Sequence, residues 1–190
     1  MPRPCRSCRG LEGDWRIDRI NAPFIYCRPL STYLKALKYR GRRELGPALG
    51  ALLAAEVGIE NLAVDLIVGV PLHPARLRAR SFNQAHEIAR ALARGYRWPL
   101  ATNVRRVIDT PPQTDLDRAR RHRLAPSAFS VPDSLAGAQV AIIDDVITTG
   151  TTVNALAAAL KAAGVLRVEA WAVARSIGEA RDSAQPGPRT

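Results

Sequence analysis

The chain has 190 residues, 47% of them hydrophobic, enough for the core of one domain of ordinary size. It lacks the run of about 18 apolar residues that a membrane span needs, so we expect a protein that is not embedded in the membrane. It also lacks the apolar stretch of a secretory signal and the cysteine content of a disulfide framework, so we expect it in the cytoplasm. The net charge of +11 comes almost entirely from arginine and favours an anionic partner such as nucleic acid, although a genome biased toward arginine codons explains it equally well.

The N-terminal half alternates helical and strand patterns after an irregular start. Residues 1–20 are polar and contain Cys5 and Cys8, and we treat them as a separate N-terminal segment. Apolar residues at helical spacing then predict two helices, the first capped by Ser31, followed by a β-branched strand that a proline ends and by a third helix. These elements are expected at about residues 31–40, 44–57, 64–71 and 83–94.

The C-terminal half begins with residues 103–130, which lack periodicity and carry a cluster of arginines. A long segment of this kind inside a compact domain is usually functional or mobile. The patterns that follow predict a buried strand, a helix and a last strand, and then a tail rich in Gly, Pro, Ser and Arg that we expect to be disordered. These elements are expected at residues 139–143, 151–163, 168–174 and 176–190.

Strands that alternate with helices predict an α/β fold with a mostly parallel sheet flanked by helices. In such sheets the ligand binds beyond the carboxyl ends of the strands. We therefore expect the chemistry to lie just after Val70, around residues 105–107, and just after Ile143.

The most specific pattern is segment 140–152, which reads Val-Ala-Ile-Ile-Asp-Asp-Val-Ile-Thr-Thr-Gly-Thr-Thr. A buried strand brings Asp144 and Asp145 to the edge of the sheet, and a loop around Gly150 opens directly into a helix. Backbone N–H groups and the dipole at a helix N-terminus favour a phosphate, and threonine hydroxyls add donors. The candidate phosphate-binding residues are Thr148, Thr149, Gly150, Thr151 and Thr152.

The two carboxylates repel a phosphate but accept hydrogen bonds from the vicinal hydroxyls of a ribose. Ordinary capping of the helix is the alternative interpretation of this segment. Capping does not account for Asp144 and Asp145 at the end of a buried strand, where desolvation penalises both charges. The sequence therefore predicts a ribose-phosphate site.

Segment 140–152 resembles, at all thirteen positions, the signature with which type I phosphoribosyltransferases bind phosphoribosyl pyrophosphate (PRPP). The resemblance implies the type I phosphoribosyltransferase fold over residues 21–175, with Asp144 and Asp145 as catalytic residues. It also implies a pyrophosphate-binding loop after Val70, for which a solvated basic loop is the alternative, and a lid over the site between residues 105 and 123. The candidate pyrophosphate ligands are Arg76, Arg78, Arg80, Asn83 and Gln84.

A narrower resemblance, over about residues 5–175, is to the ComF family. It rests on Lys38-Tyr-Arg-Gly41, on Arg80-Ser-Phe-Asn-Gln84, on Thr110-Pro-Pro-Gln113 with Arg118 and Phe129, and on the acid-threonine loop. That family is linked to natural transformation, in the handling of incoming single-stranded DNA at the cytoplasmic side of the membrane. The resemblance makes single-stranded DNA and the DNA-uptake machinery candidate partners. The lid residues expected to contact DNA are Gln113, Arg118, Arg120, Arg121 and Arg123.

The chain departs from the family's pattern at several positions. Ser81 stands where a glycine is usual, and Leu124 and Ser127 stand where Asn and Gly commonly close the lid. Family members often begin with a zinc ribbon of paired Cys-x-x-Cys units, of which Cys5 and Cys8 supply one half. Residues 1–20 are therefore expected to be a truncated ribbon, and Zn²⁺ is not expected in this chain. Mg²⁺ is expected to arrive with the pyrophosphate of PRPP.

Two hypotheses about function follow. The first is an enzyme that displaces pyrophosphate from C1 of PRPP with an unidentified nucleophile, in DNA uptake for natural transformation. The second is a non-catalytic module on the same fold, which senses PRPP or a nucleotide or binds single-stranded DNA. The sequence leaves open whether turnover occurs and what the acceptor is.

Overall fold

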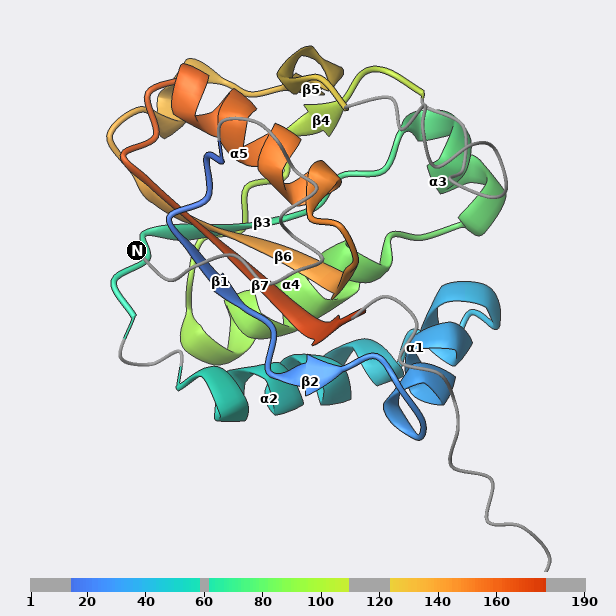
Figure 1. Cartoon of the computed structure of the whole chain (residues 1–190). Coiled ribbons are helices and arrows are strands. Elements are labelled where there is room, and N and C mark those ends of the chain that lie inside the picture. Colours follow the sequence, from blue (N-terminus) through green and yellow to red (C-terminus); the bar gives the residue numbers. More distant parts are fainter. Residues whose placement is uncertain (1–14, 59–61, 110–123, 177–190) are drawn as a thin grey trace, which may run out of the picture.

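The computed structural model describes residues 15–58, 62–109 and 124–176, and its centre is a parallel β-sheet (Figure 1). The strands of this sheet run in the order β1-β7-β6-β3, and β2 also pairs with β7. Every pairing among them is parallel, as the sequence predicts. Their bounds are β1 (Arg19–Asn21), β2 (Phe24–Ile25), β3 (Leu66–Gly69), β6 (Gln139–Ile147) and β7 (Arg167–Arg175).

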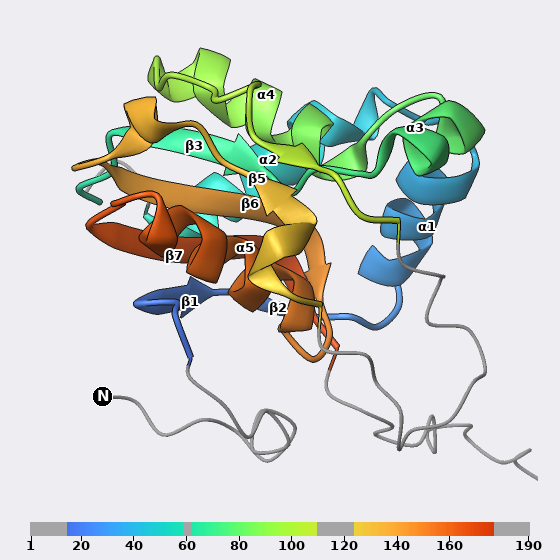
Figure 2. The same ribbon diagram turned by 90° about the horizontal axis from the view of Figure 1, so that it is seen from above.

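Helices cover both faces of the sheet (Figures 1 and 2). On one face α2 (Leu45–Val57) and α4 (Gln84–Tyr96) pack against each other and, together with α1 (Leu30–Tyr39), enclose a core around Trp171. On the other face α5 (Thr151–Ala162) encloses a second core with Val140 and Val168. This arrangement confirms an α/β fold with flanking helices.

Strand β6 extends further than the sequence indicates. We expected it to end at Ile143, but it continues to Ile147 and includes both acids. Asp144 pairs with Ala172 of β7, and Val146 pairs with Ala174. The backbone pairing supplied by β7 keeps these residues in the sheet, although aspartate itself disfavours strands.

The segment after β3 forms a short helix, α3 (Pro74–Arg80), where the sequence suggested a loop. None of its residues is buried, so it has no apolar stripe from which a helix is predicted. Its first turn is stabilised by the Nδ1 of His73, which accepts a hydrogen bond from the backbone N–H of Ala75 at 3.4 Å. Ser31 is not an N-cap as expected, because α1 begins one residue earlier and buries Ser31 in its first turn.

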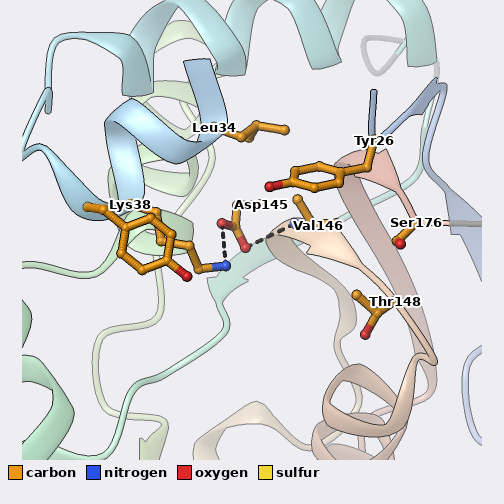
Figure 3. A pocket seen from close by; sticks show the side chains of 8 residues that line it. Tyr26, Leu34, Lys38, Asp145, Val146, Thr148 and Ser176 are labelled. Carbon is orange, nitrogen blue, oxygen red and sulfur yellow. Dashed lines mark hydrogen bonds and ion pairs between the residues drawn. The ribbon is translucent and has the colours of Figure 1, made fainter. Parts of the chain in front are cut away.

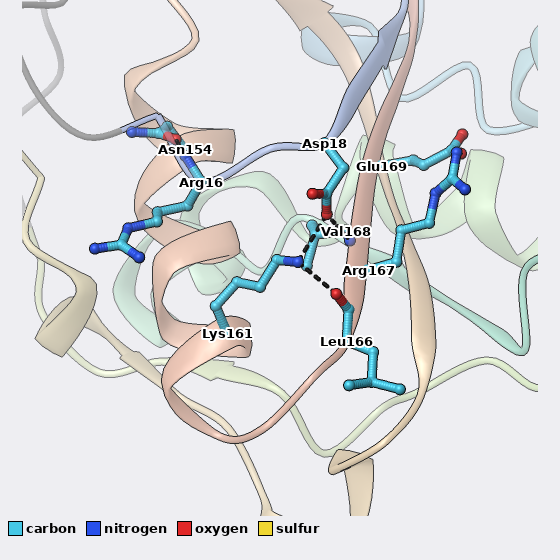
Figure 4. Close-up of polar contacts among 8 residues, drawn as sticks. All are labelled: Arg16, Asp18, Asn154, Lys161, Leu166, Arg167, Val168 and Glu169. Carbon is cyan, nitrogen blue, oxygen red and sulfur yellow. Dashed lines mark hydrogen bonds and ion pairs between the residues drawn. The ribbon is translucent and has the colours of Figure 1, made fainter. Parts of the chain in front are cut away.

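Residues 15–20, which the sequence analysis grouped with the N-terminal segment, are tied to β7 and α5 (Figure 4). Lys161 of α5 lies 2.8 Å from the carboxylate of Asp18, which also accepts a hydrogen bond from the N–H of Val168 at 2.7 Å. Burial alone raises the pKa of Asp18, but the hydrogen bonds from Lys161 and Val168 and the nearby positive charges together outweigh it, so the pKa is lowered. The backbone N–H of Arg16 donates to Asn154 at 2.8 Å.

The remaining elements lie between α4 and β6 in the chain. The two strands β4 (Arg105–Arg106) and β5 (Phe129–Ser130) pair with each other in antiparallel orientation, apart from the main sheet. The short 3₁₀ turn η2 (Pro126–Ala128) leads directly into β5, and a second one, η3 (Asp133–Leu135), lies between β5 and β6. In the ranges that the structure describes, no helix has the length and apolar character needed to cross a membrane.

Candidate functional site

The loop between β6 and α5 forms a small cradle at the helix N-terminus. Gly150 occupies the position before α5 with φ +83, a left-handed conformation that favours glycine, and it has no side chain with which to cap the helix. The hydroxyl of Thr149 accepts a hydrogen bond from the N–H of Thr151 at 3.4 Å. The hydroxyls of Thr149 and Thr151 lie 2.9 Å apart. Asp144 and residues 146–153 line a cavity of about 40 Å³ at this point. The N–H groups of a helix N-terminus beside threonine hydroxyls are suited to an anion such as a phosphate.

Trp15 lies directly against this cradle. A β-carbon built on Gly150 lies 2.7 Å from Cη2 of its indole ring, so the loop and the ring meet at a position where only glycine fits. Trp15 is not among the site residues predicted from the sequence. A tryptophan in a polar N-terminal segment has no local pattern that indicates where it packs.

The two acids face different cavities. Neighbouring residues of a strand point to opposite faces of the sheet, and Asp144 lines the cradle while Asp145 lines a second, larger cavity. The carboxylate of Asp144 accepts a hydrogen bond from the N–H of Asp145 at 2.8 Å. Burial, and then the charge of Asp145, raise the pKa of Asp144 well above its ordinary value.

Lys38 provides a cation for the acid pair (Figure 3). Its Nζ lies 3.0 Å from Oδ2 of Asp145, and the side chains are 28% and 9% exposed. The other oxygen of Asp145 accepts a hydrogen bond from the N–H of Val146 at 3.0 Å. Burial by itself lowers the pKa of Lys38, but the charge and hydrogen bond of Asp145 and the charge of Asp144 together outweigh it, so the pKa is raised.

The second cavity has a volume of about 170 Å³ and lies beside the cradle, with Val146 and Thr148 shared between the two (Figure 3). Aromatic rings from α1 and from the turn after β2 form much of its wall. Burial raises the pKa of Tyr26, which keeps its phenol protonated and able to donate a hydrogen bond. The lining residues are Tyr26, Leu34, Lys38, Tyr39, Asp145, Val146, Thr148 and Ser176.

The three arginines predicted to bind pyrophosphate all lie on α3. Arg76 Nε is 3.5 Å from a carboxylate oxygen of Asp109, and Arg78 is exposed. The guanidinium of Arg80 lies 5.7 Å from the ring centroid of Tyr39, which connects α3 to the wall of the second cavity. Ser81 ends α3 with φ +64, the left-handed conformation that explains why a glycine is usual there.

The amides of Asn83 and Gln84, which the sequence places on the pyrophosphate side, make contacts within the protein. The side-chain amide of Asn83 donates to the carbonyl of Val70 at 2.8 Å, and its oxygen caps α4 by accepting from the N–H of His86. Gln84 is buried and donates to the carbonyl of Lys38 at 3.3 Å. Both residues therefore fix the loop and the helices around it.

Several predicted site residues lie outside the described ranges. They are Cys5, Cys8, Gln113, Arg118, Arg120, Arg121 and Arg123. Leu124, which follows the lid segment, is half-buried against the core, and the thiol of Cys27 is free and exposed. Within residues 15–58, 62–109 and 124–176, no group of three or more His, Cys, Asp or Glu side chains is arranged to hold a metal ion.

A mainly parallel sheet whose central strand ends in an acid pair and a Thr-Gly-Thr loop defines a type I phosphoribosyltransferase domain. A family model described as phosphoribosyl transferase domain matches residues 79–186. The chain is 33% identical over 181 residues to DNA utilization protein YhgH of Salmonella typhi, covering 92% of this chain and 78% of that protein. It is 31% identical over 181 residues to Competence protein F of Haemophilus influenzae, covering 90% of this chain and 78% of that protein.

Among solved structures, the chain is similar to one titled "Structure of the allosteric regulatory enzyme of purine biosynthesis". The TM-score is 0.45 at 22% identity, and the match covers 69% of this chain and 26% of that one. The family match and the two relatives carry the assignment. The chain belongs to the phosphoribosyl transferase domain family, in the ComF group that includes YhgH and Competence protein F.

Proposed function

We propose that this protein binds PRPP or a related ribose phosphate at the end of β6 and acts in the cytoplasm in DNA uptake for natural transformation. The observation that carries the binding proposal is the N-terminus of α5, which begins after a glycine, beside threonine hydroxyls and two carboxylates on adjacent residues. The names of the relatives YhgH and Competence protein F support the link to DNA.

In this proposal each part of the ligand has its own partners. The 5′-phosphate binds the Thr148–Thr152 loop, where the N-terminus of α5 and threonine hydroxyls line one cavity. Asp144 and Asp145 accept hydrogen bonds from the sugar hydroxyls. The arginines of α3 bind the pyrophosphate, while Asn83 and Gln84 hold the loop in shape.

Mg²⁺ enters this proposal only together with pyrophosphate. Because the described residues form no metal cage, its ligands would be mainly pyrophosphate oxygens and water. When bound there, it neutralises charge on the leaving group.

If the protein is an enzyme, the reaction is displacement of pyrophosphate from C1 of PRPP. The bond from C1 to the pyrophosphate oxygen breaks with its electron pair on the leaving group, and a bond from C1 to a nucleophile forms. The 170 Å³ cavity beside the acid pair is the space available to that nucleophile. The protein then contributes positioning and charge stabilisation.

Replacing Asp144 and Asp145 together with alanine is expected to abolish PRPP binding and leave the fold intact. The change removes both acceptors for the sugar hydroxyls. It also removes two neighbouring acidic groups whose burial is costly, so the fold is expected to persist. Titration calorimetry with PRPP and Mg²⁺ measures the affinity, and circular dichroism verifies the fold. Undiminished affinity in a folded double variant contradicts the pocket assignment.

A second candidate function is direct binding of single-stranded DNA, favoured by exposed arginines beside an exposed tyrosine. Tyr39 is 70% exposed, and the exposed residues Arg40, Arg42 and Arg43 follow it. Such surfaces combine phosphate contacts with base stacking. We expect an affinity for an oligo(dT) strand that falls steeply with salt and is kept in the Asp144, Asp145 double variant. Affinity independent of salt, or lost in that variant, argues against a separate DNA surface.

A further inference from the structure

Lys38 is fixed at both ends. Its backbone carbonyl accepts the amide of Gln84 from α4 at 3.3 Å, and its Nζ reaches Asp145 of β6 at 3.0 Å. The chain is rich in arginine and has lysine only at positions 35, 38 and 161. Lysine carries a compact point charge on a flexible stem, whereas the planar guanidinium of arginine needs more room. Lys38 therefore fits beside a single carboxylate oxygen.

The two carboxylates that act on Lys38 both belong to the acid pair, and two tyrosines lie nearby. Asp145 and then Asp144 of β6 attract it, and Tyr39 on its own helix adds to this effect. Tyr26, on the turn after β2, faces it across the cavity (Figure 3). Lys38 is thus placed to compensate the negative charge of the pair.

Two buried carboxylates on adjacent residues are not easily ionised together, because each disfavours the charge of the other. A single ammonium compensates one of them. One oxygen of Asp145 accepts a hydrogen bond from the N–H of Val146 and the other lies 3.0 Å from Nζ of Lys38, so this carboxylate is held in a single orientation. Asp144 lies on the other face, beside the phosphate cradle.

We propose that Lys38 is a positioning residue that compensates the charge of Asp145 and holds its carboxylate oriented to accept a hydrogen bond from a sugar hydroxyl. This inference rests on the proposed ribose-phosphate function. It also links the sugar site to α1, since movement of that helix withdraws the ammonium from Asp145. Sugar binding is then sensitive to whatever occupies the cavity between Tyr26 and Tyr39.

The probe is ribose 5-phosphate, which contains the sugar and phosphate without pyrophosphate or a need for Mg²⁺. We expect Lys38→Met to weaken its affinity on the order of tenfold, the size of one weakened hydrogen bond between Asp145 and the sugar. We also expect the affinity of this variant to rise more steeply than wild type between pH 6 and 8. Without the ammonium, no cation compensates the second negative charge of the acid pair.

Matched variants separate position from charge. Lys35→Met removes a lysine from an exposed position of the same helix and is expected to bind like wild type. Lys38→Arg is expected to recover part of the affinity and the wild-type pH profile. If Lys38→Met does not fold, Lys38→Gln removes the charge while keeping a polar side chain of similar length.

Unfolding of the ligand-free protein tests the ion pair separately. Lys38→Met and Asp145→Asn are expected to be non-additive, with the double variant losing less stability than the two single changes predict. Additive losses, or a folded Lys38→Met with the affinity and pH profile of Lys35→Met, overturn the inference. Absence of ribose 5-phosphate binding in wild type instead overturns the proposed function, and with it the role of Lys38 toward the sugar.

Discussion

Replacing Gly150 with alanine is expected to weaken ribose 5-phosphate binding on the order of a hundredfold and to lower the free energy of unfolding by about 1–2 kcal/mol. Gly150 has φ +83, and the added methyl group meets the ring of Trp15 at 2.7 Å. Trp15 can turn away, but the backbone strain remains. Relief of that strain moves the N–H groups of the first turn of α5, and each charge-assisted hydrogen bond lost costs about 1.5–3 kcal/mol. Calorimetry and urea unfolding measure the two effects.

Gly137→Ala is the control for this change. Gly137 has nearly the same φ, +81, and a β-carbon there meets nothing within 4 Å. It is expected to lose a similar amount of stability and to keep its affinity. If Gly137→Ala and Gly150→Ala bind equally well, the loop before α5 is not the phosphate site.

Replacing Asp144 with asparagine is expected to make the ligand-free protein more stable at pH 8 while weakening the binding of ribose phosphate. The pKa of Asp144 in the fold is raised above the ordinary value of 3.8 by burial and by Asp145. The folded protein holds this proton more tightly than the unfolded chain, so stability is lost as pH rises through the raised pKa. Asparagine has no such loss and still accepts the hydrogen bond from the N–H of Asp145.

Thermal unfolding between pH 4 and 8 measures this effect. The advantage of Asp144→Asn over wild type should grow with pH and reach about 1–3 kcal/mol. Asp133→Asn changes an exposed acid in η3 and is expected to follow the wild-type profile. A constant difference across the pH range contradicts a buried, proton-retaining Asp144.

Some of the site was accessible from sequence because it is local. Residues 140–152 hold a strand, two acids, a loop and a helix start in one stretch, and each part has its own pattern. The helices α2 and α4 were also predicted close to their observed bounds, because apolar residues at helical spacing mark a buried face. By contrast, α3 has no buried residue and gave no such pattern.

The sequence by itself determined that this chain has a parallel α/β sheet with an acid pair and a glycine loop at the end of one strand. Only the tertiary structure decided which partners those acids have. Lys38 reaches Asp145 from a helix far away in the chain, Gln84 fixes that helix, and Trp15 covers Gly150. The physical reason is that a helix or a loop follows from neighbouring residues, whereas a buried ion pair depends on how distant elements pack.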